Sequence, residues 1–143
     1  MKYLFLSAVI GGFLCSSALA EVTVKDAWVR GTVPAQKSTG AFLTITSTEN
    51  AKLLGASSKI AKTVEIHESG MKDNVMHMRA VDFVPLPAGK PVELKPGGHH
   101  VMMMGLSAPV KEGEKVPLVL TIEDARGKRS QVQVEASVRP LGK

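Results

Sequence analysis

The chain has 143 residues, a formal net charge of +5, 22% charged residues and 4% aromatic residues. This length is enough for one domain with a sizeable core. The basic residues are scattered and the aromatic residues are few, whereas nucleic-acid-binding proteins usually concentrate both on one surface. The composition therefore speaks against a nucleic-acid partner, and the charge is typical of a solvated surface with mild attraction to acidic partners.

The first twenty residues have the pattern of a cleaved secretory signal peptide. Lys2 supplies a positive start, residues 4–14 form a short apolar stretch, and Ala18-Leu19-Ala20 is a small-residue cleavage site. The apolar stretch is too short for a stable transmembrane helix. We expect residues 1–20 to be removed, leaving residues 21–143 as a single periplasmic domain.

The only cysteine, Cys15, lies within this signal. The preceding Gly12-Phe13-Leu14 does not look like a lipoprotein cleavage box, so we expect no membrane anchor. The mature protein then has no thiol and cannot form disulfides. The missing thiol also excludes a blue-copper electron-transfer site, which needs a cysteine sulfur.

Short segments of β-forming residues, separated by turns rich in glycine and proline, follow along the rest of the chain. No helical periodicity longer than about two turns is present. This pattern predicts an all-β fold, a single antiparallel β-sandwich or barrel. The strands that we expect are residues 22–29, 41–46, 63–69, 75–83, 92–94, 116–123 and 130–138, with a further extended segment at 97–104.

All four histidines, and every methionine except Met1, lie between His67 and Met104. Imidazole and thioether groups without a thiol suit the soft monovalent copper ion. Calcium and magnesium prefer oxygen ligands, and structural zinc sites usually contain cysteine. The cluster therefore indicates copper binding.

The first half of this cluster spans a predicted hairpin. The alternation of a strand places His67 on the polar face. If the turn centres on residues 72–73, His67 and Met78 are cross-strand neighbours with Cβ atoms about 5 Å apart. His77 then points to solvent, and Met76 shares the face of Met78 but could equally fill a gap in the core.

The second half follows a pair of glycines. His100 and Met102 are one residue apart, so both side chains point to the same face of an extended chain and make natural co-ligands. His99 and Met103 point to the opposite face and are expected to pack or to be exposed. The pattern leaves open whether Met104, or Met71 and Met76 in the hairpin, adds a further sulfur.

The spacing His67-x10-Met78-x21-His100-x-Met102 resembles the signature of the periplasmic copper chaperones of the PCuAC family. Similar flanking text includes Val64-Glu65-Ile66-His67-Glu68, Val75-Met76-His77-Met78-Arg79 and Pro96-Gly97-Gly98-His99-His100-Val101-Met102, and the likeness extends from Val22 to about Val138. The resemblance implies a cupredoxin-like β-sandwich that binds one Cu(I). The ligands that it implies are His67, Met78, His100 and Met102. Some members carry a C-terminal His/Met tail for Cu(II), which this sequence lacks.

The same resemblance implies delivery of copper to the binuclear copper A site of cytochrome c oxidase, directly or through a thiol chaperone. We expect a monomer that is not an enzyme, since no Ser/His/acid or paired-carboxylate arrangement stands out. One alternative is a periplasmic copper-buffering or resistance protein without a dedicated acceptor. Another is an adhesion module whose methionines form a hydrophobic contact patch.

Overall fold

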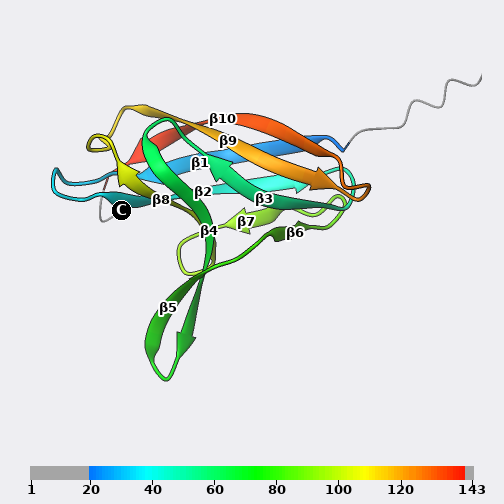
Figure 1. Ribbon diagram of the computed structural model, residues 1–143, viewed down its shortest axis with the longest axis horizontal. Coiled ribbons are helices and arrows are strands. Elements are labelled where there is room, and N and C mark those ends of the chain that lie inside the picture. The colour runs from blue at the N-terminus through cyan, green and yellow to red at the C-terminus, as the bar shows by residue number, and fades with distance from the viewer. Residues whose placement is uncertain (1–19, 141–143) are drawn as a thin grey trace, which may run out of the picture.

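The structure, a computed structural model, describes residues 20–140 and contains ten strands and no helix within that range (Figure 1). Apart from Ala20, the predicted signal peptide falls outside the described residues. No helix long and apolar enough to cross a bilayer occurs in the described part of the chain. The strands are β1 (Val22–Arg30), β2 (Ser38–Ser47), β3 (Ala51–Ser57), β4 (Ala61–Lys72), β5 (Val75–Ala80), β6 (Val84–Leu86), β7 (Val92–Leu94), β8 (His99–Leu106), β9 (Lys115–Asp124) and β10 (Arg129–Arg139).

The strands form one curled sheet in the order β5-β4-β8-β2-β1-β10-β9-β3-β6, with β7 paired to β2. Every described strand except β5 contributes to a single buried cluster, so β6 at one end of the sheet shares a core with β4 and β8 near the other. Its largest fully buried side chains include Leu43, Leu53, Met103 and Leu120. The all-β, single-domain prediction is thus confirmed.

One pairing departs from the antiparallel expectation. Strand β1 runs antiparallel to β2 but parallel to β10, with Trp28 opposite Ser137 and Arg30 opposite Arg139. A parallel pair needs a long crossover connection, and here nearly the whole chain lies between the two strands. Alternation along each strand does not reveal which strand becomes its neighbour.

Two strands were not predicted from the sequence. Strand β3 contains two alanines and Gly55, which weaken a strand pattern in the sequence, and its pairing with β9 is irregular between Leu53 and Gly55. Strand β6 contains Pro85 and lies at the edge of the sheet, where a missing backbone N–H is tolerated. The predicted strand 75–83 is also too long, since β5 ends at Ala80.

The hairpin formed by β4 and β5 projects from the body of the sandwich (Figure 1). Its two-residue turn consists of Asp73 and Asn74, with φ angles of 53° and 62°. Two consecutive left-handed residues are characteristic of a turn whose twist matches that of the strands, and Asp and Asn tolerate this conformation well. This turn sets the register of the hairpin, with Lys72 opposite Val75.

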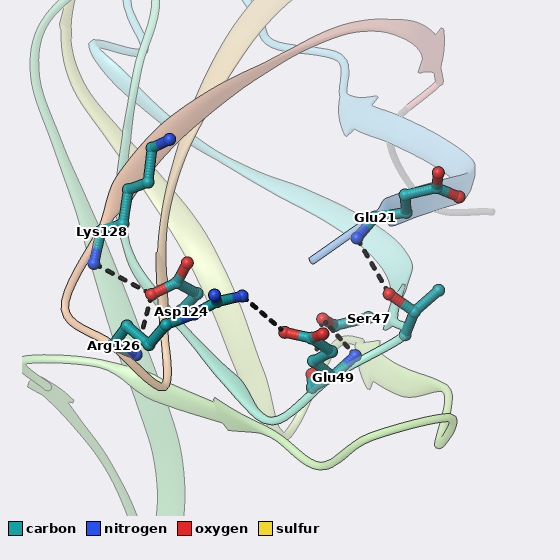
Figure 2. A network of polar contacts seen from close by, with 7 residues as sticks. Glu21, Ser47, Glu49, Asp124, Arg126 and Lys128 are labelled. Carbon is teal, nitrogen blue, oxygen red and sulfur yellow. Dashed lines mark hydrogen bonds and ion pairs between the residues drawn. The ribbon is translucent and has the colours of Figure 1, made fainter. Parts of the chain in front are cut away.

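Polar contacts secure another turn, between β9 and β10 (Figure 2). Asp124 accepts hydrogen bonds from the backbone N–H groups of Lys128 and Arg126, both at 2.9 Å. These two bonds, that from Lys128 first, hold the pKa of Asp124 below its usual value. The Arg126 side chain lies 3.7 Å from Glu49 and links this turn to the connection between β2 and β3.

Candidate metal centre

The candidate centre lies on the outer face of the sheet where β4, β8 and β2 run side by side. Alternation along β8 buries Val101 and Met103 completely in the core, so His100 and Met102 point outward. In β2, Gly40 lies opposite Met102. The predicted division of this segment into two faces is therefore correct, with Met103 as a packing residue.

His67 and His100 are opposite one another on β4 and β8, and the centroids of their rings are 5.9 Å apart. The predicted pairing of His67 with Met78 is wrong, because His67 lies opposite Ala80 and Met78 lies opposite Ser69. The turn centres one residue later than expected, which moves the partner of His67 by two positions. A shift of two keeps the face, so Met78 remains a diagonal neighbour of His67.

A pocket of about 370 Å³ opens between the hairpin and the outer face of β8 and β2. Its lining includes Met76, Met78, His100 and Met102, so three of the four predicted ligands border one space. His67 adjoins this group through its contact with the His100 ring. The remaining lining residues are Arg30, Gln36, Ser38, Thr39, Gly40, Phe42, Ser69, Pro96 and Gly97.

The ring of His67 is held by a carboxylate on its own strand. Its Nε2 donates to Oε2 of Glu65 at 2.8 Å, two residues earlier on the same face. Its Nδ1 is buried and has no hydrogen-bond partner. A histidine whose one nitrogen donates to a carboxylate presents a lone pair on the other, which is the usual arrangement of a metal-binding imidazole.

The ring of His100 is held by the turn that precedes β8. Its Nδ1 donates to the backbone carbonyl of Gly98 at 3.3 Å, which leaves Nε2 as the acceptor nitrogen. The same carbonyl accepts the backbone N–H of Ser69, so this turn is tied to the hairpin. Gly97 has a φ of 84°, a conformation that glycine adopts without strain.

The electrostatic surroundings of His100 favour its neutral form. Burial lowers the pKa of His100 below its ordinary value, and protonation of His67, the charge of Arg30 and protonation of His99 would act in the same direction. The hydrogen bond to Gly98 raises the pKa of His100 and is second in size only to burial. A neutral imidazole is the form that can bind a metal ion.

Aromatic rings lie beside His100. Phe42 is buried, but it points to the outer face and lies between Trp28 and His100, with centroid distances of 4.4 Å and 6.1 Å. Gly40 adjoins this ring, and a Cβ atom there would lie 2.9 Å from Phe42. The closeness of Gly40 and Phe42 to His100 was not predicted from the sequence, because it depends on which strands pair.

The other histidines and methionines of the cluster are placed differently. His77 is exposed, and strand alternation puts it on the opposite face of the hairpin from Met76 and Met78. His99 is opposite Glu68 and lies outside the pocket lining, as does Met104. No group of three or more His, Cys, Asp or Glu side chains among residues 20–140 could hold a metal ion.

Comparison with known proteins assigns the chain to a family. The "Putative lipoprotein LpqE-like" family matches residues 22–138, and the chain belongs to this PCuAC-type family. It is 33% identical over 114 residues to "Putative lipoprotein Lxx21020" of Leifsonia xyli subsp. xyli (strain CTCB07), with 79% of this chain and 68% of that protein covered. These family members are named as lipoproteins, which suits an exported chain.

Solved structures of copper proteins share the fold. The solution structure of Cu(I)-bound DR1885 from Deinococcus radiodurans is 30% identical, with a TM-score of 0.63, and the match covers 90% of this chain and 84% of that one. The copper-bound PCuAC domain of PmoF2 has a TM-score of 0.67 and covers 83% of this chain and 92% of that domain. At 20% identity the second likeness shows the fold alone. The cupredoxin-like β-sandwich expected from the sequence is confirmed.

Proposed function

We propose that this protein is a periplasmic metallochaperone that carries one Cu(I) on His67, Met78, His100 and Met102. The observation that supports it best is the buried, unpartnered Nδ1 of His67. An unsatisfied buried nitrogen normally costs free energy, so a native protein rarely retains one without a purpose. A cation bound beside the neighbouring imidazole and thioethers would satisfy it.

The chemistry of this ligand set suits a carrier. Two neutral imidazoles and two thioethers prefer Cu(I), and they leave its single positive charge uncompensated. They also avoid thiolates, which are prone to oxidation in an oxidising compartment. The sulfur of Met78 comes from an exposed strand of the projecting hairpin, so ligands of an acceptor can reach the ion before those of the donor have left.

The acceptor that we propose is the copper A site of cytochrome c oxidase, reached directly or through a thiol chaperone. Thiolates are softer and charged, so transfer from a His/Met site to them should be favourable. The excess of basic over acidic residues would assist encounter with an acidic acceptor. The protein would act without catalysis, and we propose that it needs no lipid anchor at Cys15.

Mixing copper-loaded protein with a metal-free copper A domain, or with a metal-free thiol chaperone, tests this proposal. Transfer should be faster than loss to a small chelator of equal affinity, because exchange occurs within a complex, and its rate should fall with added salt. A strain lacking the protein should assemble its oxidase poorly when copper is scarce.

The alternative is copper buffering without a dedicated acceptor. It predicts transfer no faster than to the matched chelator, together with normal oxidase assembly in the deletion strain. Cu(I) binding would be the same in both cases. The transfer rate and the oxidase assembly therefore distinguish delivery from buffering without testing the binding site itself.

A further inference from the structure

Three methionines form an exposed row along one face of the β4–β5 hairpin. Met71, Met76 and Met78 are 67%, 60% and 54% exposed. Large apolar side chains that gather on an exposed surface usually have a function. Met71 is directly opposite Met76, so their Cβ atoms are about 5 Å apart.

This row continues from the candidate centre outward. Strand alternation puts Met71, Met76 and Met78 on the same face as His67. Met76 and Met78 line the pocket that contains His100, whereas Met71 lies beyond it toward the tip. The row therefore connects the exposed tip of the hairpin to the inner ligands.

The other face of the hairpin has a different character. Glu68 and Arg79 are opposite one another and form an ion pair at 2.8 Å, which lowers the pKa of Glu68. Lys72 and His77 share this face. The three methionine sulfurs are thus confined to one face of the hairpin. The need for a soluble surface does not explain this segregation.

From this placement we infer a second, weaker Cu(I) site, formed by the thioethers of Met71 and Met76, through which the ion enters the inner site. The inference rests on the proposed function, because the inner site is the destination. Thioether sulfur selects Cu(I), and two neutral ligands without imidazole would hold the ion less tightly than four. The site faces solvent and is accessible to a copper donor.

The step inward is a ligand exchange. Bonds from copper to the sulfurs of Met71 and Met76 break, while bonds to Met78 and then to His67, His100 and Met102 form. The ion remains Cu(I), so no electron is transferred, and neutral imidazoles release no proton. Met76 and Met78 are two residues apart on one strand, so the distance to cover is only about 7 Å.

Methyl NMR of protein labelled with 13C at the methionine methyl groups tests the inference, with Ag(I) as a redox-inert probe for Cu(I). The first equivalent should shift the signals of Met78 and Met102. Further Ag(I) should then shift Met71 and Met76 together. If these two signals stay in place throughout the titration, the second site does not exist.

A substitution then separates metal binding from hydrophobic contact. Met71→Leu keeps the apolar surface and removes the sulfur. It should abolish the later shift of Met76 and slow Cu(I) loading several-fold, while the affinity of the first equivalent stays within about twofold. Val75→Ala, an exposed apolar residue on the opposite face, is the matched control and should load like the wild type.

The outcomes distinguish this inference from the proposed function. Wild-type loading in Met71→Leu would overturn the entry role. Shifts of Met71 and Met76 without any shift of Met78 and Met102 would overturn the proposed inner site and leave the outer one standing. Loading that slows as much in Val75→Ala as in Met71→Leu would show that the effect is not specific to the sulfur of Met71 and would overturn the inference.

Discussion

His67 and His100 lie opposite one another on neighbouring antiparallel strands, and each ring donates one N–H to a fixed oxygen. The acceptors are the Glu65 carboxylate and the Gly98 carbonyl. Nδ1 of His67 and Nε2 of His100 therefore remain as acceptor nitrogens on adjacent rings. This arrangement predicts which substitutions affect copper binding and which leave it unchanged.

Loss of a ligand on the outer face of β8 should weaken binding severely. His100→Ala and Met102→Ala each remove a side chain that lines the pocket. His99→Ala and His77→Ala are the matched controls, because neither residue lines it. Anaerobic competition titrations with a Cu(I) chelator would measure all four, and equal losses in His99→Ala and His100→Ala would contradict the account.

Glu65 should act through the orientation of His67. Glu65→Leu removes the acceptor for Nε2 and should lower Cu(I) affinity by about 10–100-fold, the usual effect of losing such a partner. Glu65→Gln keeps an acceptor oxygen and should retain most of the affinity. If the two variants bind equally well, the hydrogen bond has no role in positioning the ring.

The stability of the metal-free protein should depend on pH through His100. Because the pKa of His100 is lowered in the folded state, the unfolded chain binds this proton more tightly. The stabilising contribution is therefore complete above the ordinary histidine pKa, about 6.5, and is lost as the pH falls through the lowered value. Urea midpoints between pH 8 and 5 should fall less in His100→Gln than in the wild type. His77→Gln controls for removal of a histidine, and a wild-type pH profile in His100→Gln would refute the assignment.

Gly40 should tolerate no side chain. Gly40→Ala would place a Cβ atom 2.9 Å from the Phe42 ring, which adjoins His100. We expect a loss of about 1–3 kcal/mol in the free energy of unfolding, together with weaker copper binding. Gly55→Ala is the matched control, since nothing lies within 4 Å of its added methyl group. Similar thermal unfolding of both variants would show that the ring moves aside freely.

Much of the site could be predicted because side chains alternate strictly along a strand. That rule alone placed His100 with Met102 and put Met103 on the opposite face, which the structure shows to be the core face. The same rule explains why the error in the hairpin register left Met78 on the face of His67, since a shift of two residues preserves the face. The turn at Asp73 and Asn74, both with positive φ, determines the register.

What could not be predicted depends on strand pairing between distant segments. Phe42 lies against His100 on the outer face because β2 pairs with β8, and nothing local to Phe42 in the sequence indicates that contact. The parallel pairing of β1 with β10 has no local signal. Alternation puts Glu65 on the same face as His67, but the contact between the two side chains depends on their conformation as well.

The central claim is that one Cu(I) binds to Nδ1 of His67 and Nε2 of His100. The most direct test is long-range 1H–15N NMR of protein labelled with 15N at histidine, recorded anaerobically as Cu(I) is added. The account predicts that these two nitrogens shift and saturate at one equivalent, whereas the rings of His77 and His99 do not respond. Copper binding that leaves the rings of His67 and His100 unchanged would contradict it.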